Sequence, residues 1–557
     1  MKIALQRVLV VATGMAVGGC GDPYLTPAMR MIDEDGLAQA IQTLSSDEFE
    51  GRGPSSRGEE VTTRYLTDRF KALGMIPGNG DSYLQEVPLV EARVNNEPSL
   101  TVRGGSGTTE LAYGSNFMGW TKRVVEQSRL TNSPMVFVGY GVVAPEYDWN
   151  DYDGVDVRGR TVVILVNDPG FATQDEDLFN GNTMTYYGRW TYKYEEAARQ
   201  GAAGVLIVHE TAPAGYPWEV VTGSWSGSQF DLVADDNNMS RVAVEAWITH
   251  DAAHEVFEQA GLDFDVLKSQ ASTREFQAVP MGLRASTTLR IDIARSTSHN
   301  VLAVLPGGSR ADEYVVYMAH WDHFGRNEEL EAEGQDGIFN GAFDNATGTA
   351  GLLEVAEAFA SLDEPPARSV LFLAVTAEEQ GLLGSAYYAT HPVYARAKTV
   401  AAINMDGLNT DGPMNDITVI GYGNSELDDY ADAAAAEQGR VVRSDPEPEK
   451  GFFYRSDHFT FAKEGIPALY TDAGIDHVEH GEEWTLLRRA EYTAERYHKP
   501  SDEFDPNWDL SGAVDDLRLL FSIGLRLANE STFPNWREGN EFRARRDADI
   551  AGGRGRN

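Results

Sequence analysis

Between Ser298 and Tyr422, short apolar runs alternate with segments of helical periodicity. The runs are NVLAVLPG, YVVYMAH, SVLFLAVT, TVAAINMD and DITVIGY, and TAGLLEVAEAFASL is one of the helical segments between them. Strands that alternate with helices form a largely parallel sheet covered by helices on both faces. The pattern therefore predicts an α/β fold with a mixed, largely parallel central sheet.

The chain has 557 residues, too many for one hydrophobic core, so two or three domains are expected. Helical periodicity over 34–75 and the alternating region after 298 are separated by a second, smaller α/β pattern. We predict one domain in two parts, 34–115 and 292–533, with an insert at 116–291. The final segment, 534–557, is rich in Arg and Gly without apolar periodicity, which predicts a loose tail.

The N-terminus is typical of an export signal. Lys2 and Arg7 flank the start, and the apolar run over 8–17 is shorter than the roughly 20 residues that a spanning helix needs. The run ends in VGGC, and Cys20 is the only cysteine of the chain. This ending resembles the cleavage box of bacterial lipoproteins; the alternative is an incidental cysteine in an ordinary signal peptide.

The lipoprotein interpretation predicts a signal peptide at 1–19, a tether at 20–33 and Cys20 as the lipidated first residue. It places the protein outside the cytoplasm, anchored to a bacterial membrane by lipid. Gly21 follows the cysteine and Asp22 comes one place later than the usual inner-membrane retention signal, which favours the outer membrane, facing the periplasm or the exterior.

Composition argues against nucleic acid and anionic membrane surfaces as partners, and against disulfides as a source of stability. The formal net charge is −40, whereas a surface that binds nucleic acid or anionic lipid needs clustered Lys and Arg. A single cysteine leaves no disulfide to stabilise the fold.

Five segments place metal-binding side chains where an apolar run gives way to a polar turn. The segments are MAHWDHFG, NGAFDNATG, VTAEEQGLLGS, INMDG and YHKPSDEFD. Loops at the carboxyl ends of parallel strands converge, so distant residues can meet there. Imidazole and carboxylate ligands are those that zinc prefers. The candidate site residues are His320, Asp344, Glu378, Glu379, Asp406 and His498.

The adjacent Glu378 and Glu379 suggest a division of roles. Neighbouring side chains in an extended or turning backbone point in different directions, so one can bind metal while the other faces a substrate. One metal ligand and one general base are what metal-assisted hydrolysis requires.

These motifs resemble the co-catalytic di-zinc peptidase family that includes bacterial leucyl aminopeptidases, glutamate carboxypeptidase and the transferrin receptor ectodomain. The resemblance is close over 298–530 and looser over 34–115. Within the insert, TVVILVND and YKYEEAARQGAAGVLIVHE resemble a protease-associated domain over about 130–250. The alternative for the insert is another small α/β domain.

The resemblance implies a role for each site residue. His320 and Asp406 would bind one Zn²⁺ and Glu379 and His498 the other, with Asp344 bridging both. Glu378 would be the general base, and the peptide bond after Asp344 is commonly cis in this family. Two zinc ions about 3.5–4 Å apart can share a hydroxide and polarise a scissile carbonyl.

Three further residues are assigned supporting roles. Asp322 and Asp502 are predicted to orient the imidazoles, with an exposed acid as the alternative for Asp502. Tyr454 is predicted to donate a hydrogen bond to the tetrahedral oxyanion, with a packing tyrosine as the alternative.

The resemblance implies a zinc-dependent exopeptidase that acts on peptides at a free N-terminus. Carboxypeptidase or dipeptidase action within the same chemistry is the alternative. A glutaminyl cyclase, which holds one zinc, and a receptor-like binding module without a catalytic ligand set are more distant alternatives. Neither a G-x-S-x-G nor an H-E-x-x-H motif is present. Side-chain specificity, native metal and oligomeric state stay open.

Overall fold

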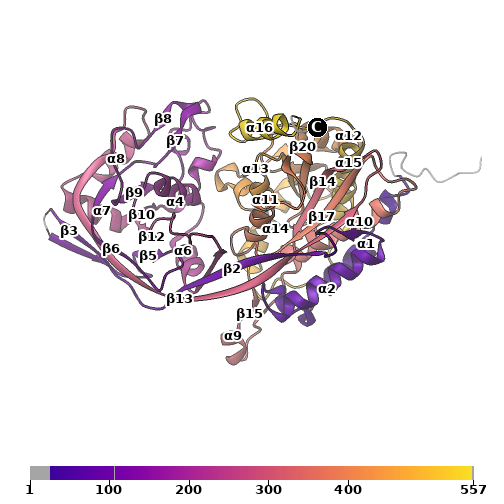
Figure 1. Cartoon of the computed structure of the whole chain (residues 1–557), viewed down its shortest axis with the longest axis horizontal. Helices are drawn as coiled ribbons and strands as arrows, with labels where there is room; N and C mark the ends of the chain where they lie inside the picture. Colours follow the sequence, from indigo (N-terminus) through magenta and orange to yellow (C-terminus); the bar gives the residue numbers. More distant parts are fainter. Residues whose placement is uncertain (1–25, 106, 555–557) are drawn as a thin grey trace, which may run out of the picture.

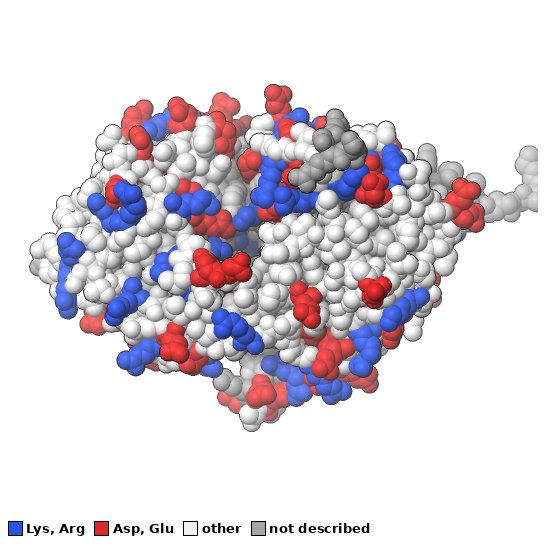
Figure 2. All heavy atoms as spheres, in the orientation of Figure 1, with Lys and Arg blue, Asp and Glu red and all other residues white. Residues whose placement is uncertain are grey.

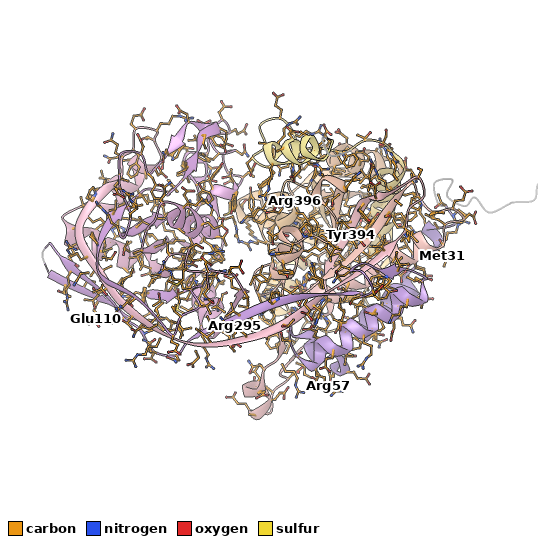
Figure 3. The ribbon with its side chains drawn as sticks, viewed as in Figure 1. Met31, Arg57, Glu110, Arg295, Tyr394 and Arg396 are labelled. Atoms are coloured by element: carbon orange, nitrogen blue, oxygen red, sulfur yellow. The ribbon has the colours of Figure 1, made fainter. Side chains whose placement is uncertain are left out.

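The computed structural model describes residues 26–105 and 107–554, which form two lobes (Figure 1). Lobe 1 is built from residues 26–94 and 292–554, and lobe 2 from residues between them. The predicted signal peptide and Cys20 lie outside the described residues. Strand β13 (Val279–Leu305) runs through both lobes, and Arg295 lies on it between them (Figure 3). Among the helices described, none is both long and apolar enough to cross a membrane.

Lobe 1 contains a mixed sheet whose centre is parallel. Its strands are β1 (Ile76–Pro77), β2 (Leu84–Val94), β14 (Arg310–His320), β17 (Arg368–Val375), β18 (Thr399–Asn404), β19 (Asp416–Val419), β20 (Val441–Ser444) and β21 (Ala468–Asp472). The order β17, β14, β18, β21 is parallel throughout, while β13 and β2 add antiparallel strands beyond β17. A small hairpin, β15 (Gly325–Arg326) and β16 (Ile338–Phe339), stands apart.

Helices cover both faces of this sheet. The helices of lobe 1 are α1 (Glu34–Leu44), α2 (Arg57–Ala72), α9 (Glu328–Ala332), α10 (Gly348–Ala360), α11 (Leu383–Thr390), α12 (Leu427–Glu437), α13 (His458–Lys463), α14 (Gly481–Glu495), α15 (Ser511–Asn529) and α16 (Arg543–Arg554); α9 lies beside the β15–β16 hairpin, away from the sheet (Figure 1). Along β14, Val315 and Tyr317 pack with α10 and α15, whereas Val316 and Met318 pack with α11 and α13. The predicted α/β class is confirmed.

Lobe 2 has its own sheet, in the order β4–β3–β13–β6–β9–β10–β12–β5. The strands of this sheet besides β13 are β3 (Leu100–Gly104), β4 (Gly107–Leu111), β5 (Phe117–Trp120), β6 (Gln127–Phe137), β9 (Thr161–Leu165), β10 (Gly204–His209) and β12 (Val244–Thr249). Strands β7 (Val143–Ala144) and β8 (Trp149–Asn150) form a separate hairpin. The helices of lobe 2 are α3 (Pro169–Thr173), α4 (Trp190–Arg199), α5 (Thr211–Ala214), α6 (Trp218–Trp225), α7 (His250–Ala260) and α8 (Phe264–Ala271). Strand β11 (Ser228–Leu232) leaves this sheet and pairs with β2 of lobe 1.

The second lobe begins earlier than the predicted boundary at residue 116. Strands β3 and β4 pair with β13 in the lobe 2 sheet, and Leu100, Val102 and Leu111 are fully buried in its core. Alternating inward side chains therefore assign this hairpin to lobe 2, although it was predicted to belong to the first part of the larger domain.

Both ends of the described chain are packed, contrary to prediction. In the expected tether, Ile32 is fully buried, and Arg518 donates hydrogen bonds to the carbonyls of Met29 and Ile32. In the expected loose tail, α16 buries Arg546, which donates to the carbonyls of Thr399 and Val400 at 2.9 Å. Arg396, labelled in Figure 3, pairs with Asp549 of α16 at 3.1 Å. The many arginines of residues 534–557 favoured a solvated tail, but arginines of α16 bind backbone carbonyls and acidic side chains elsewhere in lobe 1.

Candidate metal centre

Side chains from five separate segments meet at one edge of the lobe 1 sheet. Strand β14 pairs in parallel with both β17 and β18, so the carboxyl ends of the three strands lie together. The side chains are His320 at the end of β14, Glu378 and Glu379 after β17, Asp406 after β18, Asp344 in the short helix η5 (Ala342–Thr347), and His498 after α14.

Asp344 lies between the two histidines. Its Oδ1 is 3.3 Å from Nε2 of His320, and its Oδ2 is 3.3 Å from Nε2 of His498. Asp406 Oδ1 is also 3.3 Å from His320 Nε2, and Glu379 Oε2 is 3.3 Å from His498 Nε2. Each imidazole therefore faces one oxygen of Asp344 and one oxygen of a second carboxylate.

These four separations fit the ligands of a common ion better than they fit hydrogen bonds. A charge-assisted N–H···O bond is about 2.7–2.9 Å long. Zinc–nitrogen and zinc–oxygen distances of about 2.0–2.2 Å place two ligands of a tetrahedral ion about 3.3–3.5 Å apart. The residues thus form two half-sites that share Asp344, each with the spacing and donor types to hold a zinc ion.

Glu378 lies beside the half-site of His320. Ligand atoms of Glu378, His320 and Asp406 all lie within 4.8 Å of one another. The preceding Ala377 has a φ of 53°, a left-handed conformation that is uncommon outside glycine. The chain turns sharply there, between the end of β17 and the two glutamates.

Burial and close charges shift the pKa values of the centre strongly. Burial and neighbouring acids raise the pKa of both Glu378 and Glu379 well above the ordinary value. Burial opposes ionisation of Asp344 too, but its contacts with His320 and His498 hold its pKa well below the usual range. Four carboxylates facing two imidazoles carry an excess of negative charge, which divalent cations would balance.

Asp322 supports two members of the centre. His320 Nδ1 lies 3.2 Å from the backbone carbonyl oxygen of Asp322, a contact that orients Nε2 toward the carboxylates. The carboxylate of Asp322 accepts a hydrogen bond from the backbone N–H of Glu378 at 3.1 Å. Burial raises the pKa of Asp322 to about 6.

Asp502 is fully buried, so its reading as an exposed acid is wrong. Its carboxylate accepts hydrogen bonds from the backbone N–H groups of Phe343 and Asp344, both at 3.1 Å. Asp502 therefore fixes the backbone of the loop that contains Asp344. The sequence predicted instead that Asp502 orients the imidazole of His498. Burial raises the pKa of Asp502 to about 6.

Two positioning residues were missed in the sequence. Ser456 donates a hydrogen bond to Asp406 Oδ2 at 2.5 Å, and the fully buried His323 lies 2.5 Å from Glu379 Oε1 through its Nδ1. His323 lies within the motif MAHWDHFG and Ser456 two residues after Tyr454, but the local sequence does not show which carboxylate each residue contacts.

Two more residues brace the loops beneath the centre. The buried guanidinium of Arg52 donates to the carbonyls of Leu44, Trp321, Asn340 and Gly341 at 2.6–2.8 Å. The Asn345 side chain donates to Met405 and accepts from Gly407, joining the loops of Asp344 and Asp406. The Asp344–Asn345 peptide bond is cis, as the family resemblance predicts.

Tyr454 lies in an aromatic cluster between the lobes. Its ring centroid is 5.1 Å from that of Phe459 and 6.2 Å from that of Tyr186. Burial raises the pKa of its phenol, and the main charges acting on it come from Glu541 and Asp168, not from the metal centre. The structure supports the packing alternative for Tyr454 and not the predicted contact with an oxyanion.

Tyr497 and Tyr470 adjoin the centre. The ring of Tyr497 stacks on that of His498, with centroids 3.7 Å apart and an interplanar angle of 29°. The hydroxyl of Tyr470 donates a hydrogen bond to the backbone carbonyl of Asp406 at 3.2 Å.

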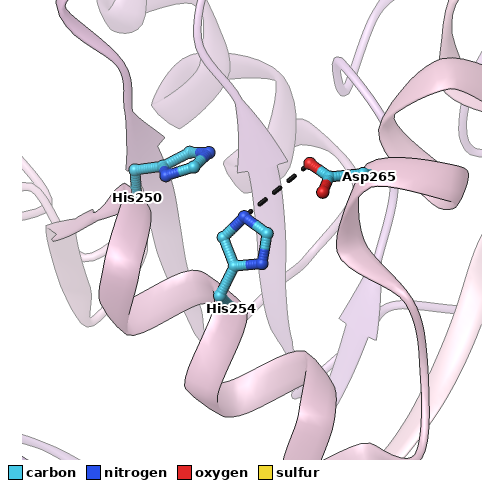
Figure 4. Close-up of side chains that lie close together, drawn as sticks. All are labelled: His250, His254 and Asp265. Atoms are coloured by element: carbon cyan, nitrogen blue, oxygen red, sulfur yellow. Dashed lines mark ion pairs between the residues drawn. The ribbon is translucent and has the colours of Figure 1, made fainter.

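A second group of possible ligands lies in lobe 2 (Figure 4). His250 and His254 are one turn apart on α7, and His254 Nε2 is 3.7 Å from Asp265 Oδ1 of α8. Their side chains are 40–41% exposed for the histidines and 74% for Asp265, whereas His320 is 1% exposed. This group lacks the buried, oriented ligands of the first.

Comparisons with known proteins find similarity to peptidases. The sequence model of peptidase family M28 matches residues 300–522. Aminopeptidase NAALADL1 of Mus musculus is 31% identical over 132 residues, 23% of this chain and 16% of that protein. A probable zinc metalloprotease of Pyricularia oryzae is 34% identical over 113 residues, 20% of each chain. Leupeptin-inactivating enzyme 1 of Streptomyces exfoliatus is 29% identical over 185 residues, 33% of this chain and 38% of that protein. The aligned segments thus span well under half of each relative.

Two solved structures were also matched. The aminopeptidase from Aneurinibacillus sp. strain AM-1 has a TM-score of 0.49 at 20% identity, covering 92% of this chain and 97% of that chain. BSAP, a zinc aminopeptidase from Bacillus subtilis, has a TM-score of 0.41 at 17% identity, covering 91% and 98%. Over residues 300–522, which are less than half of its length, this chain is similar to peptidase family M28.

Proposed function

We propose that this protein is a zinc-dependent exopeptidase, acting as an aminopeptidase on peptides with a free N-terminus. The observation that carries the proposal is the pair of half-sites that share Asp344, with all four N···O separations at 3.3 Å. The family match and the names of the relatives, an aminopeptidase and a zinc metalloprotease, support the same chemistry.

In this proposal five side chains would hold two zinc ions. His320 and Asp406 would hold one and Glu379 and His498 the other, with Asp344 shared between them. Zinc would supply Lewis-acid activation of a water molecule and of the scissile carbonyl.

Glu378 acts as the general base in the same proposal. It takes the proton of the attacking water and passes it to the leaving amine. Burial raises the pKa of Glu378, the direction that suits a group that must both accept and return a proton. Asp322 fixes the backbone of Glu378, and so positions the base relative to the half-site of His320.

Replacement of Glu378 by Gln tests the assignment. We expect hydrolysis of aminoacyl peptides to be abolished while the purified protein still holds about two zinc ions per chain. His498→Ala, by contrast, should lose metal, and Asp363→Asn, an exposed turn residue, should change neither quantity. If Glu378→Gln still hydrolysed peptides, the assignment of Glu378 as the general base would be wrong. A content of one zinc ion per chain would favour a cyclase-like site, and a content of none would favour a binding module.

A panel of substrates with either end blocked, assayed with and without a chelator, distinguishes aminopeptidase action from carboxypeptidase or dipeptidase action. An aminopeptidase requires a free amino group and tolerates a blocked carboxyl group. The opposite tolerance would favour the carboxypeptidase alternative.

We also propose that Cys20 carries a lipid anchor and that lobe 2 is a protease-associated domain. The first rests on the basic start, the short apolar run and the VGGC ending; the second on the motifs of residues 130–250. Incorporation of labelled palmitate that Cys20→Ser abolishes would support the anchor. Retention of the Cys20→Ser protein in the membrane fraction would contradict it.

A further inference from the structure

One edge of lobe 2 packs directly against lobe 1 beside the metal centre. The backbone N–H of Met184 donates to the carbonyl of Pro448 at 3.1 Å, and the ring of Tyr186 is 5.3 Å from that of Phe459. Lys463 of α13 pairs with Glu195 of α4 at 3.0 Å. These contacts bring the segment that precedes α4 next to the segment that precedes α13.

Each of these two segments contributes an arginine. Arg189 precedes α4 and is 9% exposed, and its Nε has no hydrogen-bond partner. Nε and Nη2 of Arg455 are likewise buried without a partner. Arg455 Nη2 reaches across to lobe 2, 3.8 Å from the position that a Cβ on Gly215 would occupy.

Neither arginine forms an ion pair with a carboxylate within the described part of the chain. Their contacts are aromatic: the Arg189 guanidinium lies 5.9 Å from the Trp190 ring centroid, and that of Arg455 lies 5.2 Å from Phe452. Burial and the charge of Arg455 lower the pKa of Arg189 to about 10, so the two cations act on one another.

The arrangement is costly, because Arg189 is buried and Arg455 is partly buried, and burial of a charge requires a partner. The chain has 86 Asp and Glu against 46 Lys and Arg, so carboxylates are abundant, yet none among the described residues pairs with either arginine. A guanidinium presents a planar fork of donors that matches a carboxylate. The missing partner is therefore expected to be an external anion.

Arg455 also lies next to the metal centre, because it directly precedes Ser456 in the chain. The hydroxyl of Ser456 donates a hydrogen bond to the proposed ligand Asp406 at 2.5 Å. Basic atoms are visible in the recess between the two lobes (Figure 2). A peptide bound at the metal centre could therefore extend toward the arginines.

We propose that Arg189 and Arg455 form a carboxylate-binding subsite, contributed by both lobes, that holds an acidic group of the peptide substrate. This inference rests on the proposed peptidase function and narrows its substrate class to short peptides with a carboxylate near the scissile bond. The carboxylate comes either from the free C-terminus of a short peptide or from an Asp or Glu side chain. Lobe 2 then takes part in substrate selection.

Matched substrates test the subsite and identify the source. Leu-Ala and Leu-Ala amide differ only in the C-terminal charge, and Leu-Glu amide and Leu-Gln amide differ only in the side-chain charge. We expect one charged member to have a KM roughly ten- to a hundredfold below that of its neutral partner. In Arg455→Gln and Arg189→Gln the ratio should fall to within threefold of one, with partial rescue in Arg455→Lys. Arg284→Gln, an exposed arginine of lobe 2, is the control.

Thermal unfolding separates this role from a structural one. Removal of an unpartnered buried cation should leave the melting temperature of the ligand-free protein unchanged or raise it, whereas a structural arginine would lower it. Equal KM values for charged and neutral partners, or a lowered melting temperature with an unchanged KM ratio, would overturn the subsite.

Failure to hydrolyse any of the four peptides would instead contradict the proposed function. Calorimetric titration of the Glu378→Gln protein with Leu-Ala and Leu-Glu amide would still test the subsite: tighter binding than the neutral partners supports it, and equal binding overturns it.

Discussion

The carboxylate of Asp322 accepts a hydrogen bond from the backbone N–H of Glu378 at 3.1 Å. This contact joins the loop after β14 to the loop after β17, and it fixes the backbone from which Glu378 and Glu379 project. Asp322 thereby links the segment of one metal ligand, His320, to the proposed base.

Asp322→Ala should lower kcat about ten- to a hundredfold, because the backbone of Glu378 loses its acceptor. Asp322→Asn keeps an acceptor oxygen and should lose less. The measurement is steady-state hydrolysis of an aminoacyl peptide together with zinc content. Equal losses in the two variants would show that charge at position 322 matters and the hydrogen bond does not.

Asp502→Ala should destabilise the protein by about 2–4 kcal/mol, because it leaves the N–H groups of Phe343 and Asp344 without their acceptor. Chemical unfolding of the chelator-treated protein measures the change without a contribution from bound metal. Asp363→Ala, an exposed acid, should change stability by less than about 0.5 kcal/mol. If Asp502→Ala changed the free energy of unfolding as little as the control does, the proposed role of Asp502 would be refuted.

Glu354→Gln should make stability less sensitive to pH. Glu354 of α10 is 2% exposed, and burial raises its pKa from 4.5 to about 7. Between these values the folded protein retains a proton that the unfolded chain releases, so stability of the wild type falls as pH rises through this window. Glutamine stays neutral and can still accept from the Asp33 N–H.

At pH 8 the Glu354→Gln variant should therefore exceed the wild type by up to about 3 kcal/mol, and near pH 4 the two should agree. Urea unfolding at both pH values measures the difference. The exposed Glu364→Gln is the control. A constant difference across the range would contradict the buried, protonated state of Glu354.

The double variant His250→Ala, His254→Ala should retain the zinc and the activity of the wild type. These side chains are about two-fifths exposed and lie in lobe 2, so metal bound there should exchange readily on dialysis. Zinc content after dialysis and peptide hydrolysis are the two measurements. A loss of tightly bound zinc would show that lobe 2 holds a metal site of its own.

The motifs predicted the residues that lie together in the candidate metal centre because each motif is local: an apolar run ends, a polar turn follows, and an imidazole or carboxylate comes at the junction. His320 and Asp406 are examples, and parallel pairing of β14 with β18 brings them together. The supporting residues could not be predicted in this way. Arg52 binds carbonyls at Trp321 and Gly341, 269 and 289 residues away along the chain.

The sequence by itself determined the α/β alternation and the set of imidazoles and carboxylates at strand ends, since both follow from short-range patterns of apolar and polar residues. Only the tertiary structure decided that Asp344 lies between His320 and His498, that Arg455 reaches across to Gly215 of lobe 2, and that α16 packs against β18. Such pairings depend on distances between segments remote along the chain, which packing of the lobes fixes and no local pattern encodes.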